Sequence, residues 1–251
     1  MEKHIFKNAE ELTRAVADWI VDLINTNTRN KKQFDFLLSG GNTPKSLYHL
    51  LATEKYKRQI DWKRINIFFG DERVVPFDDD RNNGRMAYDA LLKHVPVPES
   101  QIHYINTSIK PEVSALRYES LLREHFAGKE YTFDLSLLGM GDDGHTLSVF
   151  PGSEIINEKQ RWVVSVFVPA QNMYRVTLTP AVVNASSQVA FLISGASKSK
   201  VLSEILSPTA APHFYPAQLI QPTNGELHWF VDQEAFQEAI VNKQQAIGKR
   251  P

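Results

Sequence analysis

The sequence predicts an α/β fold in which a parallel sheet carries helices on both faces. Short apolar runs of strand length, such as Phe34–Leu38, Ile65–Phe69 and Gln188–Ile193, alternate with stretches whose apolar residues recur at helical spacing. That alternation is typical of parallel sheets covered by helices. Because no linker, repeat or low-complexity stretch interrupts the 251 residues, we expect a single domain over residues 1–251.

Each predicted strand is a short run of apolar or β-branched residues. In chain order these runs lie at residues 34–38, 65–69, 102–105, 133–138, 162–168, 188–193 and 227–231. Three of them end in polar, glycine-containing segments at residues 39–43, 70–73 and 139–145. Since the carboxyl ends of parallel strands share one edge of a sheet, we expect these three segments to meet.

The predicted helices follow from capping residues, prolines and leucine spacing. Asn8 and Glu11 have the spacing of a capping box, and the apolar residues behind them predict a helix of about four turns. Pro44 suits the first position of the next helix. Further helices are expected after the polar loop 78–83, with Met86, Leu91 and Leu92 inward, and from Pro111, Ser197 and Gln233.

Composition excludes several classes of function. The net charge of −1 offers no long-range attraction to nucleic acid or to an anionic membrane, so we expect neither as a partner. The absence of cysteine excludes disulfides, thiolate metal sites and a cysteine nucleophile. The sequence has neither an apolar run of about 18 residues nor a signal peptide's apolar core, so the expected location is cytoplasmic.

Residues 139–145 place three glycines, two carboxylates and His145 directly after a predicted buried strand. Glycines let a backbone turn sharply and approach a ligand closely. An imidazole titrates near pH ~6.5 and can accept a proton from water at neutral pH. We interpret His145 as the base of an enzyme site; the alternative is a histidine hydrogen-bonded within a strand-end turn.

The same segment matches the dinucleotide-binding pattern G-x-G-x-x-G from Gly139 to Gly144. That pattern requires a helix of several turns immediately afterwards, yet Pro151 and Gly152 interrupt the chain too early. A second strand ending in an acidic residue at the usual offset of about 20 residues is also missing. The sequence therefore disfavours nucleotide binding.

Residues 39–43 resemble an anion site because they offer two glycines, two hydroxyls and the free N–H groups that open a helix. The segment is not a P-loop, since Lys45 is misplaced for that pattern. A purely structural alternative is a tight turn in which Ser39 or Thr43 caps the helix.

A bound phosphate also requires cations, and three candidates accompany the predicted strands. Arg175 and Lys198 lie beside apolar runs, and Lys198 falls in the first turn of a helix, where the dipole disfavours a cation unless an anion is present. The alternative for Lys198 is a solvated surface lysine. Arg73 is either a ligand residue or the partner of Asp71 and Glu72 in a structural ion pair.

Other catalytic chemistries lack their motifs. The nucleophile elbow G-x-S-x-G and the zinc motif H-E-x-x-H are absent, and the eight histidines do not cluster at metal-ligand spacing, so we expect no metal. The chemistry that remains is the attack of water, activated by a general base, on a phosphorylated small molecule.

Several ordered motifs together resemble the 6-phosphogluconolactonase family, which is related to the glucosamine-6-phosphate deaminases. The resemblance covers nearly the whole chain and lies in residues 39–44, 71–76, 139–145, 150–152, 175–179, 195–198, 216–218 and 227–235. It implies a three-layer, doubly wound α/β fold with a mostly parallel sheet, of the deaminase and ribose-5-phosphate isomerase type. It also implies hydrolysis of 6-phosphoglucono-δ-lactone without a cofactor, in the oxidative pentose phosphate pathway.

The resemblance also implies roles for individual residues. His145 would be the general base, Arg73 would lie near the sugar or its developing oxyanion, and Asp71 matches the position that abstracts a proton in the deaminases. The residues expected around the phosphate are Ser39, Gly40, Gly41, Thr43, Arg175 and Lys198. The expected partner is the phosphosugar lactone, bound by a monomer or a weak homo-oligomer.

The sequence departs from the family pattern at residues 147–150, which read Leu-Ser-Val-Phe where Ala-Ser-Leu-Phe is usual, and at Asn82, where serine is usual. The deaminases carry a glutamate at the position of Phe150, and phenylalanine cannot relay a proton. Two alternatives remain open at this point: an isomerase or deaminase of amino-sugar phosphates, and a sugar-phosphate-sensing domain without catalysis.

Overall fold

The computed structural model describes residues 1–30, 33–207, 215–237 and 239. Its strands are β1 (Glu2–Phe6), β2 (Phe34–Leu38), β3 (Ile65–Phe69), β4 (Asp71–Arg73), β5 (Ile102–His103), β6 (Leu135–Leu138), β7 (Val163–Val168), β8 (Met173–Leu178), β9 (Gln188–Ile193) and β10 (Glu226–Asp232). Its α-helices are α1 (Ala9–Asn30), α2 (Asn42–Leu51), α3 (Glu54–Lys57), α4 (Asn83–Ala90), α5 (Pro111–His125), α6 (Pro180–Val183) and α7 (Ser199–Ile205).

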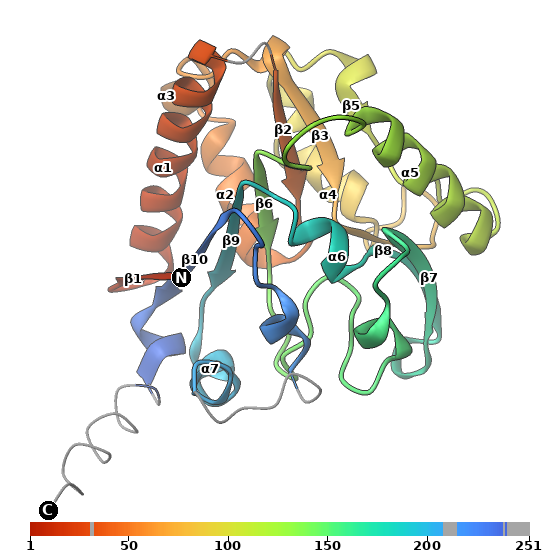
Figure 1. Cartoon of the computed structure of the whole chain (residues 1–251). Coiled ribbons are helices and arrows are strands. Elements are labelled where there is room, and N and C mark those ends of the chain that lie inside the picture. The colour runs from red at the N-terminus through yellow and green to blue at the C-terminus, as the bar shows by residue number, and fades with distance from the viewer. Residues whose placement is uncertain (31–32, 208–214, 238, 240–251) are drawn as a thin grey trace, which may run out of the picture.

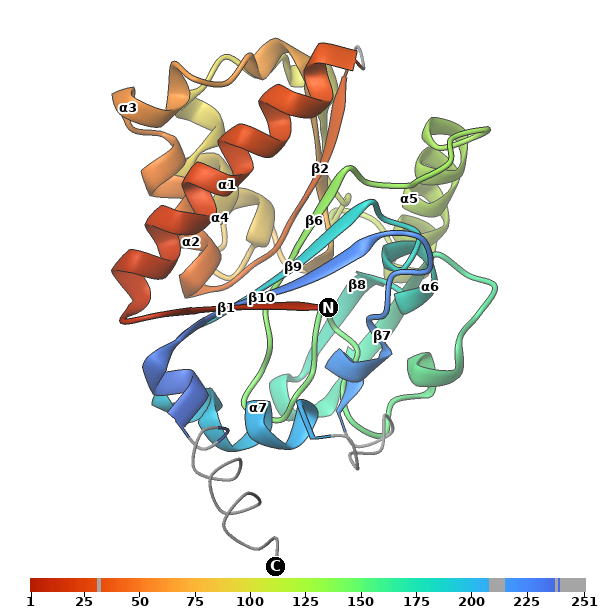
Figure 2. The same ribbon diagram turned by 60° about the vertical axis from the view of Figure 1, so that its left-hand side comes forward.

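A parallel seven-stranded sheet in the order β1-β10-β9-β6-β2-β3-β5 forms the middle layer. Helices α1 to α4 cover one face, and α5, α6 and a small second sheet lie on the other (Figure 1, Figure 2). The chain runs from β2 outward to β3 and β5, then returns to the other side of β2 with β6, β9 and β10. This reversal is the switch point of a doubly wound fold, so the predicted fold class is confirmed.

The strands of the main sheet are buried because both faces are covered. Every residue of β2 and β3 is buried, as expected of strands that lie between two helical layers. The long helix α1 packs its apolar stripe, including Leu12, Val16 and Ile20, into this core. Within the described residues, no helix combines the length and apolar composition needed to cross a bilayer.

The second sheet is antiparallel, has the order β4-β8-β7 and was not predicted. The run 162–168 was correctly predicted as a strand, but it belongs to this sheet. Gly70 joins the two sheets: its N–H donates to Leu38 O at 3.0 Å in the main sheet, and its carbonyl accepts from Leu178 N at 2.8 Å. The segment 70–73, expected as a loop, therefore continues as β4 beside the carboxyl ends of the main strands.

Three further features differ from the prediction. Helix α1 has 22 residues, longer than the expected four turns, because its buried face continues through Ile24 and Thr28. Pro44 lies at the third helical position, since α2 begins at Asn42. Strand β1 was missed because it is a mostly exposed edge strand with no continuous apolar run. The helix predicted from Gln233 is present over 233–237, and the residues that follow lie mostly outside the described part of the chain.

Candidate active site

A polar cavity of about 390 Å³ opens at the switch point, beyond the carboxyl ends of β2, β6 and β9. All nine residues predicted for the site line it: Ser39, Gly40, Gly41, Thr43, Asp71, Arg73, His145, Arg175 and Lys198. The small sheet supplies Asp71, Arg73 and Arg175 from β4 and β8, which pair in antiparallel register. The structure thus brings together residues that are up to 159 positions apart in the sequence, from Ser39 to Lys198.

The loop between β2 and α2 leaves helix donors available to the cavity. Gly41 is the N-cap of α2, has a φ of 103° and makes no side-chain capping bond, so the structural alternative, in which Ser39 or Thr43 caps the helix, does not hold. The buried Tyr48 hydroxyl instead holds the Ser39 backbone, accepting from its N–H at 2.9 Å and donating to its carbonyl at 2.8 Å. The N–H groups of a helix's first turn have no partner inside the helix, which suits an anion.

Asn83 also lines the cavity, although no sequence pattern indicated it as a site residue. A Cβ on Gly40 would lie 2.1 Å from Asn83 Oδ1, so glycine is required at position 40 for this close approach. The Asn83 amide donates to the carbonyl of Asp71 at 2.9 Å. Asn83 therefore joins the β2–α2 loop to β4, and only the packing of α4 against both segments reveals it.

His145 is oriented by the neighbouring Asp143. The distance from His145 Nδ1 to Asp143 Oδ1 is 2.5 Å, and the same oxygen accepts from the His145 N–H at 3.1 Å. With Nδ1 occupied in this way, Nε2 is the nitrogen left for substrate. The ring also packs against Phe150, with centroids 4.3 Å apart. The alternative of a purely structural histidine is disfavoured, because the ring lines the cavity and is 28% exposed.

The charge of Asp143 is favoured by this contact. Burial raises the pKa of the Asp143 carboxyl, but hydrogen bonds from the His145 backbone and ring, together with the charge of that ring, outweigh burial and lower the pKa overall. Asp143 is therefore an ionised acceptor at neutral pH, which keeps the proton of a neutral His145 on Nδ1.

Asp71 and Arg175 form a buried pair through β4 and β8. Asp71 Oδ2 accepts from Ser148 Oγ at 2.6 Å and lies 3.4 Å from Arg175 Nη1. Arg175 also donates to Gln171 Oε1. Burial lowers the pKa of Arg175, partly offset by the charge of Asp71. Arg175 Nε is buried and has no protein partner among the described residues, so it remains a donor for a ligand.

Arg73 does not form the ion pair with Glu72 that was the alternative to a ligand role. Glu72 instead accepts from the backbone N–H groups of Arg73, Asn83 and Gly84, each at 2.7 Å, at the beginning of α4. Burial raises the pKa of Glu72 to about 7, although the three hydrogen bonds act in the opposite direction and lower it. Arg73 Nη1 donates to the carbonyl of Arg81 at 2.6 Å, while its buried Nε has no partner in the described part of the chain.

Lys198 is only 22% exposed and pairs with Asp142, with Nζ 2.7 Å from Oδ1, so it is not the solvated surface lysine of the alternative interpretation. The hydrogen bond from Lys198 lowers the pKa of Asp142. Ser197 Oγ donates to the same Asp142 oxygen at 3.1 Å. The loop after β6, which carries His145, is thereby joined to the segment after β9.

A doubly wound sheet whose switch point carries a polar cavity with three cationic side chains defines an α/β protein that binds small anionic molecules. The chain belongs to the family described as Glucosamine-6-phosphate isomerases/6-phosphogluconolactonase, whose family model matches residues 7–229. This membership confirms the resemblance found in the sequence motifs.

Relatives and solved structures agree with that assignment. A 6-phosphogluconolactonase of Synechocystis sp. is 44% identical over 79% of this chain and 81% of its own length. A 6-phosphogluconolactonase of Nostoc sp. is 38% identical over 89% of this chain and 92% of its own. The structure of 6-phosphogluconolactonase from Trypanosoma cruzi superimposes with a TM-score of 0.80 at 30% identity, covering 94% of this chain and 96% of that one.

A monomeric glucosamine-6-phosphate deaminase has the same fold, with a TM-score of 0.82, 21% identity and coverage of 94% of this chain and 99% of that one. At that identity the likeness concerns the fold alone. The position that distinguishes the two activities in the sequence, Phe150, carries an aromatic ring packed on His145 and no carboxylate.

Proposed function

We propose that His145 and Arg73, with Asp71 as a positioning residue, form the catalytic centre with which this chain hydrolyses 6-phosphoglucono-δ-lactone to 6-phosphogluconate. The activity is that of its relatives, and the chain is a lactone hydrolase of the pentose phosphate pathway. The observation that supports the residue assignment is the geometry of one cavity: an Asp143-oriented imidazole faces the same space as the opening of α2 and three cations.

The phosphate end of the substrate is held by the β2–α2 loop and two cations. Gly40, Gly41 and Thr43 provide backbone N–H groups, and Ser39 and Thr43 provide hydroxyls, which suit an anion. Lys198 and Arg175 contribute positive charge, and Arg175 Nε is a buried donor without a partner among the described residues. Binding this remote anion fixes the position of the lactone carbonyl and so converts binding energy into orientation.

The addition step begins at His145 Nε2, which accepts a proton from water as the water oxygen attacks the lactone carbonyl carbon. Asp143 stabilises the imidazolium that forms, because it is an ionised carboxylate on Nδ1. The carbonyl oxygen becomes an oxyanion, for which the unpartnered Nε of Arg73 is a suitable donor.

The elimination step breaks the bond between the carbonyl carbon and the ring oxygen. The imidazolium returns its proton from Nε2 to that oxygen, giving a hydroxyl and leaving a carboxylic acid that ionises at neutral pH. Asp71 is assigned a positioning role, because its carboxylate is occupied by Ser148 and faces Arg175. No step in this scheme requires a cofactor.

Proton release from freshly prepared 6-phosphoglucono-δ-lactone, compared with spontaneous hydrolysis, tests the proposal. We expect acceleration by the purified chain and no ammonia release from glucosamine 6-phosphate. Acceleration of neither reaction would favour the sugar-phosphate sensor, and ammonia release would favour the deaminase. Phe150 argues against the deaminase, because position 150 presents an aromatic ring to His145 where the deaminases carry a glutamate.

We also propose that the chain acts as a monomer or weak homo-oligomer, because the nine predicted site residues of one chain already meet in one cavity. Light scattering after size exclusion tests this, and a dimer that persists on dilution would contradict it.

A cytoplasmic location is proposed because an anionic sugar phosphate does not cross a membrane unaided; cell fractionation tests it. Relatives in Arabidopsis thaliana and Oryza sativa are chloroplastic.

A further inference from the structure

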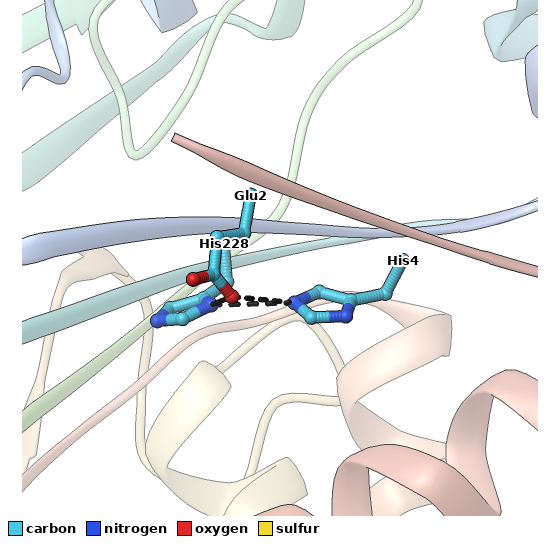
Figure 3. A group of neighbouring side chains, drawn as sticks. All are labelled: Glu2, His4 and His228. Carbon is cyan, nitrogen blue, oxygen red and sulfur yellow. Dashed lines mark hydrogen bonds and ion pairs between the residues drawn. The ribbon is translucent and has the colours of Figure 1, made fainter.

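Three potential metal ligands converge at the edge of the main sheet, away from the active-site cavity. Glu2 and His4 lie two residues apart on β1 and therefore point to the same face of the sheet. His228 is the residue of β10 that pairs with Glu2 in the parallel register. Figure 3 shows the carboxylate and the two imidazole rings directed toward one another. They are the one group of at least three potential ligands found among the described residues.

The separations of the three facing atoms match a tetrahedral metal site. His4 Nε2 lies 3.3 Å from His228 Nδ1, and Glu2 Oε2 lies 3.4 Å from His228 Nδ1 and 3.6 Å from His4 Nε2. Charge-assisted hydrogen bonds are shorter, at about 2.7–2.9 Å. Zinc bonds of about 2.0–2.2 Å place two tetrahedral ligands about 3.3–3.6 Å apart. The three distances thus equal those between pairs of ligand atoms in a tetrahedral zinc site.

Neighbouring residues hold both rings in this orientation. His228 Nε2 lies 2.8 Å from Gln188 Oε1, which accepts the Nε2 proton and leaves the Nδ1 lone pair facing the group. The His228 ring packs against Trp19 of α1, with centroids 5.1 Å apart, and the His4 ring stacks on Phe230 at 4.5 Å. A metal would therefore meet ligands that are already ordered.

The three ligands differ in exposure in a way that leaves an entry path. The side chain of His228 is 5% exposed, that of His4 35% and that of Glu2 62%. The exposed side of the group is open to solvent, so a water molecule can occupy a fourth position. Two imidazole nitrogens and one carboxylate oxygen are ligands that suit Zn²⁺.

We propose that Glu2, His4 and His228 bind one Zn²⁺ ion, with water as the fourth ligand. The ion joins the N-terminal edge strand β1 to β10, because two ligands come from one strand and one from the other. Its role is structural: it stabilises the folded chain by binding it in preference to the unfolded one. The competing explanation is a histidine pair joined only by a hydrogen bond.

Zinc titration of the full, tag-free and chelator-treated chain by calorimetry tests the proposal, with thermal unfolding as a second readout. We expect one Zn²⁺ at this site, and a rise in the unfolding temperature when zinc is added. His4→Gln and Glu2→Gln keep polar side chains of similar size, and each should weaken binding at least about tenfold. The matched control is His49→Ala, which removes an exposed histidine of α2 and should change neither readout.

The variant His145→Ala distinguishes zinc binding at the active site from zinc binding at the sheet edge. In that variant we expect the sheet-edge binding and the thermal shift to persist, whereas His4→Gln should abolish the thermal shift. Equal zinc affinity and an equal thermal shift in wild type, His4→Gln and Glu2→Gln would overturn the proposal. So would the absence of zinc binding by the wild-type chain.

Discussion

The His145 imidazole owes its readiness as a base to one neighbouring carboxylate. Asp143 occupies Nδ1 at 2.5 Å, and Phe150 packs on the ring, so both the tautomer and the ring plane are set before substrate arrives. A base prepared in this way needs no movement to accept a proton at Nε2. Its contribution is therefore expected in turnover rather than in binding.

His145→Ala should lower kcat by about 10²–10⁴-fold, which is the usual contribution of a general base. The Michaelis constant should change much less, because the phosphate contacts remain. Steady-state kinetics on fresh lactone measure both values, and an unchanged unfolding temperature shows that the variant is folded. Turnover near that of wild type would remove His145 from this role.

Lys198→Ala should raise the Michaelis constant, by about tenfold or more, and leave kcat nearly unchanged if Lys198 binds substrate and transition state equally. Lys200→Ala, which removes an exposed lysine of α7 two residues after Lys198, is the matched control. The same kinetic assay serves for both variants. If both have the wild-type constant, Lys198 does not bind the phosphate.

At the scale of the element, the loop after β6 is shaped by how closely its backbone approaches the His145 ring. The Gly141 N–H donates to the His145 carbonyl at 2.8 Å, which closes the loop. A Cβ at position 141 would lie 2.1 Å from His145 Nδ1, whereas a Cβ at position 139 would lie 3.8 Å from its nearest neighbour, Ser39 Oγ. Gly141 therefore protects the geometry of the base, whereas Gly139 is far less constrained.

Gly141→Ala should lower kcat by about 10²-fold, because a methyl group displaces the ring from Asp143 and a small misplacement of a catalytic group costs about that much. Gly139→Ala should retain most of the activity. Parallel kinetic assays of the two variants check the expectation. Equal activity would mean that the loop tolerates a side chain at position 141.

A second element-scale feature fastens α5 to the start of β2. Buried Asp35 lies 2.7 Å from His125 Nε2 and accepts hydrogen bonds from Lys129 Nζ and Asn66 Nδ2, each at 2.8 Å. Burial raises the pKa of Asp35, but the hydrogen bonds and charges of His125 and Lys129 outweigh it and lower the pKa below its ordinary value. The ionised form is therefore favoured by folding.

The lowered pKa of Asp35 determines how the free energy of unfolding changes with pH. A carboxyl whose pKa is lowered by folding stabilises the protein above its unfolded pKa, about 3.9, and loses this contribution as the pH falls through the lower, folded pKa. Asp35→Asn should reduce the free energy of unfolding by about 1–3 kcal/mol at neutral pH. Urea titrations should show the difference between the variant and wild type narrowing below pH ~4. A difference that grows on acidification would contradict the assigned direction.

At the scale of the whole molecule, the two sheets share one core. Val163, Val176 and Leu178 of the small sheet are buried in the same apolar cluster as Leu135 and Leu137 of the main sheet. Gly70 continues the hydrogen bonding of one sheet into the other. The active-site cavity lies over this junction, so its geometry depends on both sheets remaining packed together.

We therefore predict that residues 1–251 unfold as a single domain. Differential scanning calorimetry should show one transition whose calorimetric and van't Hoff enthalpies agree. An active-site ligand such as 6-phosphogluconate should shift the whole transition upward, since it binds only the folded chain. Two separated transitions, with only one shifted by ligand, would show that the sheets fold independently.

The sequence by itself determined the parallel α/β architecture, because alternating apolar runs and helical spacing are local properties of the chain. It also predicted nine residues that line the cavity, among them Ser39, His145 and Lys198, since strand ends and glycine-rich turns are local patterns and parallel strands present them at one edge. The family resemblance added the substrate, because several ordered motifs together are specific.

Tertiary structure alone decided the contacts between segments distant in sequence. The antiparallel sheet, the Asp71–Arg175 pair and the position of Asn83 against Gly40 depend on packing across 43 to 104 residues. His4 and His228 meet across 224 residues through strand pairing that no local spacing reveals. Local propensity depends on neighbouring residues, whereas register and burial depend on which strands finally lie side by side, and that is settled only when the whole chain is folded.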